Sequence, residues 1–207
     1  MSIKHVQYAL WGLVAIAGGA FGGYFYVNGF DANAPFTKTV SKVSGKASIG
    51  GPFELVSHEG NKVTEAALEG SPSVVFFGFT HCPEICPTTL SDIDGWLGEL
   101  GDEGKSIKSY FVTVDPERDN PEVMKDYVTS FSERIVGLTG TPEKVSQVLK
   151  NYRIYSNKVR LGDGDYTMDH TASVILLDSK GEFVSTVSYG ELTETAVKKL
   201  RLLVKRG

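Results

Sequence analysis

The feature that most constrains the fold is an uninterrupted apolar run, SVVFFGF, at residues 73–79. Its β-branched and aromatic residues are typical of a strand buried on both faces, because a strand with one wet face would alternate apolar and polar residues. Such a strand needs a layer of helices above it and another below it. The run therefore predicts an α/β domain with a central sheet.

Strand and helix patterns alternate after this run. We expect a helix at 87–100, a strand at 106–115, helices at 121–131 and 141–152, a hairpin at 172–189 and a closing amphipathic helix at 193–206. Another hairpin, around Glu59-Gly60-Asn61, precedes the run. Right-handed crossovers leave few arrangements of these elements, and the simplest is a thioredoxin-like mixed sheet flanked by helices.

A second apolar run lies near the N-terminus. The 20 residues from Tyr8 to Val27 carry no charge, and at about 1.5 Å per residue they span roughly the 30 Å hydrocarbon core of a bilayer. We expect residues 1–7 to be a short cytoplasmic N-terminus, 8–27 a transmembrane anchor, 28–51 a polar tether and 52–207 the thioredoxin-like domain.

The alternative for the N-terminus is a cleaved signal peptide, because Ala32-Asn33-Ala34 has the small-x-small form of a cleavage site. The apolar run is longer than a usual signal-peptide core, and Pro35 directly after the cut disfavours processing. We therefore favour a retained anchor.

The charge pattern argues against a nucleic-acid partner. Net charge is −4, and the lysines and arginines are scattered except in the C-terminal segment KKLRLLVKR. A nucleic-acid-binding domain of this size would carry a basic patch or stripe.

Both cysteines follow the apolar strand directly, in HCPEICP, and each precedes a proline. Because a residue before proline is disfavoured in the α region, we expect Cys82 and Cys86 in a loop and the helix to begin at Pro87. The helix start favours the thiolate form of both side chains. A structural disulfide is the alternative, but closing so short a loop would remove little chain entropy. The sequence favours reactive or metal-binding thiols.

A third ligand is sought among the four histidines. We expect His5 and His58 on the surface, and His81 adjoins the cysteine loop. His170 directly precedes a predicted buried strand, at the sheet edge that faces the cysteine loop in a thioredoxin-like plan. Two sulfurs and an imidazole suit Cu(I) and also Zn(II), and three ligands favour an exchangeable ion. Met168 is a soft spare donor, although a methionine there more often serves packing.

Three segments in this order, GFTHCPEICPTTL, TVDPERD and MDHTASVILLD, resemble the Sco (SenC/PrrC) family of membrane-anchored copper proteins of cytochrome c oxidase assembly. The resemblance extends from residue 48 to the end. It implies that Cys82, Cys86 and His170 are ligands of copper, as Cu(I) or Cu(II). It also implies an acidic partner-binding loop, for which a solvated helix-capping turn is the alternative. The loop residues are Asp115, Glu117, Arg118 and Asp119.

The resemblance further implies a metallochaperone that delivers copper to, or prepares the cysteines of, the CuA centre of cytochrome c oxidase subunit II. Other copper chaperones and thioredoxin-like reductants would be additional partners. The implied location is a bacterial inner membrane, crossed once, with the domain in the periplasm. The short N-terminus lacks the Arg- and Ser-rich character of a transit peptide, which favours a bacterium.

The competing function is a thiol-disulfide oxidoreductase or peroxiredoxin-like peroxidase with Cys82 and Cys86 as its redox pair. Thioredoxins use C-x-x-C and place a proline where this chain has Asp169-His170-Thr171. Peroxiredoxins place a threonine three residues before the reactive cysteine, whereas Thr80 lies two before Cys82. Both departures favour metal binding over an enzyme. An interaction domain with inert cysteines is the third interpretation.

Overall fold

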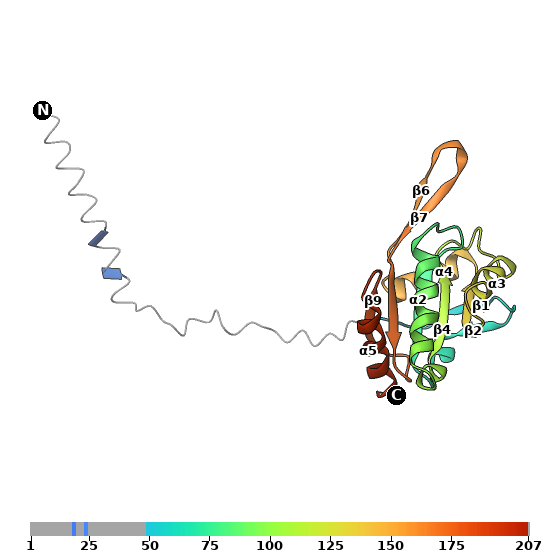
Figure 1. Ribbon diagram of the computed structural model, residues 1–207. Coiled ribbons are helices and arrows are strands. Elements are labelled where there is room, and N and C mark those ends of the chain that lie inside the picture. Colours follow the sequence, from blue (N-terminus) through green and yellow to red (C-terminus); the bar gives the residue numbers. More distant parts are fainter. Residues whose placement is uncertain (1–17, 20–22, 25–48, 207) are drawn as a thin grey trace, which may run out of the picture. The chain divides into compact units, whose positions relative to one another are not determined.

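The computed structural model divides into two units, residues 1–46 and 47–207, and describes residues 18–19, 23–24 and 49–206. Among the described residues, no helix is both long and apolar enough to cross a bilayer. The anchor predicted at 8–27 and the tether predicted at 28–51 lie almost wholly outside the described residues, as do His5 and the candidate cleavage site. The fold described below belongs to the second unit (Figure 1).

A seven-stranded mixed sheet forms the centre of this unit, in the order β2-β1-β5-β4-β3-β8-β9. Its strands are β1 (Glu54–Ser57), β2 (Lys62–Thr64), β3 (Ser73–Gly78), β4 (Lys108–Thr113), β5 (Ile135–Thr139), β8 (Ser173–Leu177) and β9 (Phe183–Ser188). Strands β3, β4 and β5 are parallel, and the outer strands are antiparallel to their neighbours. All of β3 is buried, as its apolar sequence predicts.

Helices flank the sheet, which confirms the predicted α/β class. They are α2 (Ile85–Glu99), α3 (Pro121–Thr129), α4 (Pro142–Asn151) and α5 (Thr193–Val204). Helix α2 packs against α5, α3 against β5 and α4 against β1. Asn120 and Thr141 cap α3 and α4 through their side-chain oxygens, and each helix has proline in its first turn.

A separate two-stranded sheet was not predicted. Strands β6 (Ser156–Arg160) and β7 (Tyr166–His170) pair antiparallel with each other and project from the domain (Figure 1). The sequence SNKVR of β6 is mostly polar, so it shows no apolar alternation from which a strand could be predicted. Strand β7 ends at His170, so this hairpin carries one of the predicted ligands.

The start of α2 differs from the prediction. Cys82 lies in a loop as expected, but the helix begins at Ile85, so Cys86 is in its first turn and the expectation that it lies outside the helix was wrong. The restriction on a residue before proline is a preference, and a proline within the first turn loses no intrahelical hydrogen bond. The Cys86 N–H instead donates to Cys82 Sγ at 3.3 Å.

Candidate metal centre

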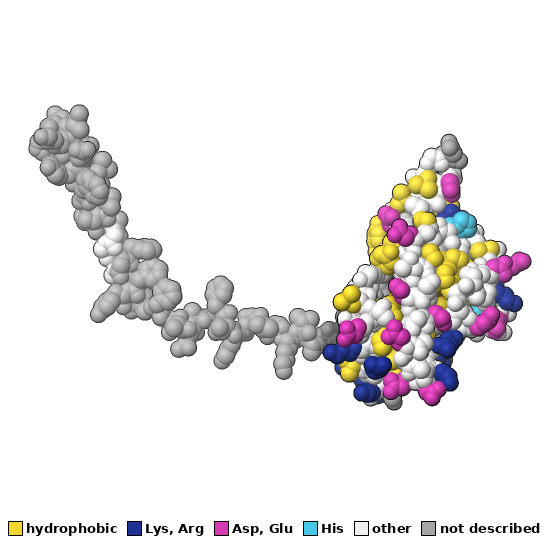
Figure 2. All heavy atoms as spheres, in the orientation of Figure 1, with side chains coloured by type: hydrophobic (Ala, Val, Ile, Leu, Met, Phe, Trp, Pro, Cys, Tyr) yellow, Lys and Arg dark blue, Asp and Glu magenta, His cyan; other side chains and the backbone are white. Residues whose placement is uncertain are grey.

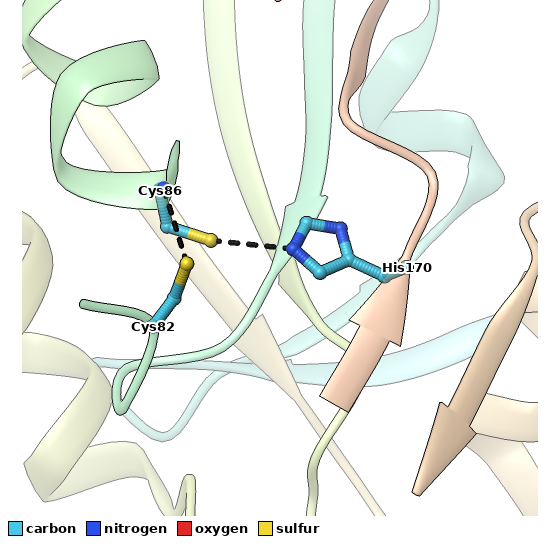
Figure 3. A group of neighbouring side chains, drawn as sticks. All are labelled: Cys82, Cys86 and His170. Carbon is cyan, nitrogen blue, oxygen red and sulfur yellow. Dashed lines mark hydrogen bonds between the residues drawn. The ribbon is translucent and has the colours of Figure 1, made fainter. Parts of the chain in front are cut away.

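Three elements bring the predicted ligands together. Cys82 comes from the loop after β3, Cys86 from the first turn of α2 and His170 from the end of β7, and their side chains point toward one another (Figure 3). One donor atom from each residue lies within 4.8 Å of the other two. Cys86 Sγ is 3.5 Å from His170 Nε2. Within the described residues, this is the one group of three or more His, Cys, Asp or Glu side chains close enough to share a metal ion.

The two cysteine residues differ in exposure. Cys86 is fully buried, whereas Cys82 is partly exposed and lines an open groove with a volume of about 490 Å³. His170, Met168 and Tyr155 line the same groove. Met168 also packs against the core, which supports a packing role for its side chain. A ligand exchange reaction could therefore begin at Cys82 while Cys86 stays covered.

The imidazole of His170 is oriented by its neighbours. Its Nδ1 lies 3.0 Å from the carbonyl oxygen of Thr171. Because a carbonyl oxygen can only accept a hydrogen bond, Nδ1 carries the proton in that contact and Nε2 presents its lone pair to the sulfurs. The buried rings of Phe76 and Phe79 pack on the imidazole at centroid distances of 6.2 and 5.8 Å. Such support from the carbonyl and the rings is typical of a metal-binding histidine.

The two thiols differ in pKa, so the expectation of two thiolates was half right. The hydrogen bond from Cys86 lowers the pKa of Cys82 to about 4, against the opposing effect of burial. The hydrogen bond to Cys82 and burial raise the pKa of Cys86. One sulfur is thus a thiolate, and the other is a thiol that donates to it. Proximity allows only one of these sulfurs to hold negative charge in the metal-free site.

Gly78, at the end of β3, provides space for this arrangement. A Cβ atom at this position would lie 2.6 Å from Cys86 Sγ and 2.7 Å from a ring carbon of Phe111. Neither neighbour can move freely, because both are fully buried. Glycine is therefore required for the buried sulfur to sit beside the strand.

The donor set fits a soft metal ion. Two sulfurs and one imidazole nitrogen are ligands that copper and zinc prefer over magnesium or calcium. A closed structural zinc site would use four protein ligands. The three residues therefore suit an ion that is bound at low coordination number and exchanged.

Comparison with known proteins decides the family, since residues 41–205 match the model for SCO1/SenC. The chain belongs to the SCO1/SenC family. Protein SCO1 of Saccharomyces cerevisiae is 40% identical over 160 residues, which is 75% of this chain and 54% of that protein. The chain spans about half the length of the curated relatives that it matches.

Solved Sco structures share the fold. The structure of Bradyrhizobium japonicum ScoI with copper bound is 44% identical, with a TM-score of 0.70, and the match covers 75% of this chain and 99% of that one. BsSco, a member of the Sco family of cytochrome c oxidase assembly proteins, is 21% identical with a TM-score of 0.60, over 76% of this chain and 94% of that one. At that identity the second likeness supports the fold alone.

The DPERD segment of this Sco-family chain, residues 115–119, buries both of its aspartates. Asp115 and Asp119 are buried, so their carboxylates are not a surface for a partner. Asp119 accepts hydrogen bonds from the hydroxyls of Thr80 and Thr113, both at 2.6 Å, and from the Thr80 N–H at 3.2 Å. Because Thr80 lies two residues before Cys82, this carboxylate ties the cysteine loop to β4.

Two details of this segment correct the sequence interpretation. The helix α3 is capped by Asn120, so the four loop residues are not its cap. Glu117 is the most exposed side chain of the four, at 59%, and the Arg118 side chain is 19% exposed. The prediction of partner contact is thereby restricted to these two residues.

The other two described histidines, His58 and His81, lie outside the ligand group. His58 is half-buried and not on the surface as expected. Its Nδ1 accepts a hydrogen bond of 2.9 Å from the N–H of Gly137, a residue of β5. His81 is exposed, with Nδ1 3.1 Å from the hydroxyl of Thr80.

Sequence reasoning missed Asp119 as a support of the cysteine loop, because only the fold brings it to Thr80.

Proposed function

We propose that this protein is a metallochaperone that carries one copper ion on Cys82, Cys86 and His170. The observation that carries the proposal is the convergence of two thiols and an oriented imidazole beside an open groove. The copper-bound B. japonicum ScoI, which is 44% identical over the 75% of this chain that it matches, supports copper as the cargo. Thiolate and imidazole ligands favour Cu(I), and Cu(II) would require the same three residues.

The three residues have different roles in copper binding. The Cys82 thiolate meets the incoming ion first, since Cys82 lines the groove and Cys86 does not. Cys86 then loses its proton to the solvent as its sulfur joins the site, and His170 offers the lone pair of Nε2. Binding therefore releases a proton, and oxidation of the two sulfurs to a disulfide removes two of the three ligands.

The proposed destination is the CuA centre of cytochrome c oxidase subunit II, either by copper transfer or by reduction of its cysteines. The resemblance of the three sequence motifs and membership of the SCO1/SenC family support this role. Glu117 and Arg118 are the proposed contacts with that partner, and other copper chaperones or thioredoxin-like reductants are proposed further partners. The proposed setting is a bacterial inner membrane, with the uncharged run at 8–27 as a single-pass anchor and the domain in the periplasm.

Thiol-disulfide exchange is the second candidate function, and the low pKa of Cys82 specifically favours it. A thiolate next to a second cysteine is the arrangement that attacks disulfides in oxidoreductases. Both functions use the same sulfurs, so His170 distinguishes them: imidazole completes a copper site but takes no part in forming a sulfur–sulfur bond.

The experiment compares His170→Ala with Cys86→Ala for copper affinity, disulfide reduction potential and CuA assembly. For a copper chaperone, His170→Ala weakens copper binding and CuA assembly but still forms the disulfide. Cys86→Ala loses copper binding, disulfide formation and CuA assembly. For a thiol reductase, His170→Ala keeps most of its assembly activity. Unchanged copper affinity in His170→Ala would remove the histidine from the site and with it the main support for metal handling.

A further inference from the structure

The hairpin that carries His170 is outside the main sheet. In the described part of the chain, β6 and β7 pair only with each other. Strand β7 is held near the cysteines by its two-residue link to β8, by packing of Met168 and His170 against core residues, and by a set of side-chain contacts at its other end. Figure 2 shows the hairpin as a protrusion from the domain. The position of His170 therefore depends on those contacts as well as on the link.

Arg118 makes most of the contacts between the DPERD segment and β7. Its Nε donates to Asp115 Oδ2 at 2.5 Å, and its Nη1 donates to the carbonyl oxygen of Tyr166 at 3.1 Å. Its guanidinium carbon lies 3.8 Å from the centre of the Tyr166 ring. A planar guanidinium that is stacked and hydrogen-bonded at once is a geometry that lysine cannot reproduce.

Tyr166 contacts three side chains: Arg118, Lys158 and Asp115. Arg118 stacks on its ring, and Lys158 Nζ lies 3.9 Å from the same ring centre. The hydroxyl donates to Asp115 Oδ1 at 2.9 Å. Lys158 is in turn paired with Glu117 at 2.7 Å, so both strands of the hairpin are tied to the DPERD segment.

Arg118 and His170 both contact the ring of Phe79, which is buried. The guanidinium carbon of Arg118 is 5.9 Å from the ring centre of Phe79, and Phe79 packs edge-on against His170 with an interplanar angle of 88°. Tyr166 and His170 are four residues apart on β7, and residues at even spacing along a strand share a face. A shift of Tyr166 along or about the strand would therefore displace His170 as well.

We propose that Arg118 and Tyr166 are positioning residues that hold β7 so that His170 Nε2 faces the two sulfurs. The proposal rests on the copper site proposed above and adds how its third ligand is placed. Neither residue belongs to the ligand group, so each acts through His170 and not on the metal.

The test measures Cu(I) affinity of the reduced full chain by competition with a chromophoric Cu(I) chelator. Tyr166→Leu removes the stacked ring and leaves the Arg118–Asp115 ion pair in place. We expect it to weaken Cu(I) binding by about tenfold, the lower end of the effect of removing a group that supports a metal ligand. Arg201→Gln, exposed on α5 and outside the hairpin, is the control and leaves the affinity unchanged.

A double-mutant cycle separates positioning from general damage. In a His170→Ala background, Tyr166→Leu should have no further effect, because its influence passes through the missing imidazole. Arg118→Lys, which keeps a cation beside Asp115, repeats the test if Tyr166→Leu does not fold. In the reduced metal-free protein, proton NMR should show weaker contacts between the His170 and Phe79 rings in either variant.

Three results would overturn the proposal: unchanged Cu(I) affinity in both variants, an equal loss with and without His170, or unaltered ring contacts. Failure of the proposed function looks different, because the unmodified protein would then not bind Cu(I) at all. In that case the NMR contacts alone decide whether Arg118 and Tyr166 position the imidazole.

Discussion

At the scale of single residues, the two cysteines have different chemistry although they are only four positions apart. Cys82 is partly exposed, and its sulfur accepts hydrogen bonds from both the side chain and the backbone N–H of Cys86. Cys86 is buried and keeps its proton. The sequence predicts a reactive pair, but it could not predict this difference, because burial behind Gly78 and Phe111 is a property of the fold.

The pH dependence of alkylation tests this difference. Since the pKa of Cys82 is lowered to about 4, the reduced metal-free protein should react with iodoacetamide at Cys82 at a nearly constant rate from pH 8 down to about 5, and the rate should fall as the pH approaches 4. Cys82→Ser should react slowly throughout. A rate that rises between pH 8 and 9, as for an ordinary thiol, would contradict the assignment.

Gly78 gives a second residue-scale prediction. Gly78→Ala places a methyl group against Cys86 Sγ and Phe111, so it should lower the free energy of unfolding by about 1–3 kcal/mol and weaken copper binding. Gly95→Ala is the matched control: nothing lies within 4 Å of a Cβ there, and it should stabilise α2 by about 0.5–1 kcal/mol. Urea denaturation and copper titration check both variants. Equal stability of the two would show that the space beside Cys86 is not needed.

At the scale of elements, long apolar or amphipathic segments were predictable and short polar ones were not. The buried strand at Ser73–Gly78 and the helices opened by Pro121 and Pro142 have strong local signals. Strand β6 has none, because most of its residues are exposed and the pairing with β7 alone makes it a strand. The position of His170 was predicted from the thioredoxin-like plan, but the hairpin that carries it was not.

Asp119 gives a prediction about how elements are joined. Its carboxylate accepts three hydrogen bonds that connect the cysteine loop to β4, and an amide would turn one acceptor into a donor. Asp119→Asn should therefore lower the free energy of unfolding by about 1–3 kcal/mol and weaken copper binding. Asp126→Asn, exposed on α3, serves as the control. If chemical denaturation gives the same midpoint for both variants, the carboxylate is not what holds the loop.

At the scale of the whole molecule, the folded unit that carries the proposed copper site follows an apolar N-terminal segment. Residues 49–206 contain the complete sheet, its helices and the ligand group. The segment at 8–27 contributes to the proposed function only by location, since a chaperone for an oxidase subunit would act at the same membrane.

Membrane association tests that location. With residues 8–27 present, the protein should stay with bacterial membranes after an alkaline carbonate wash, because 20 uncharged residues suffice to span a bilayer. A variant lacking 8–27 should stay in the cytoplasm. Mature protein whose N-terminal sequence begins at Pro35 would show instead that the segment is a cleaved signal peptide.

The central claim is that Cys82, Cys86 and His170 form one copper site that requires reduced sulfurs. The most direct measurement is a Cu(I) titration of the purified protein in its reduced form and in its Cys82–Cys86 disulfide form. We predict one copper ion per reduced chain and none on the oxidised chain, because the disulfide removes two of the three ligands. Equal copper uptake by the two forms would contradict it.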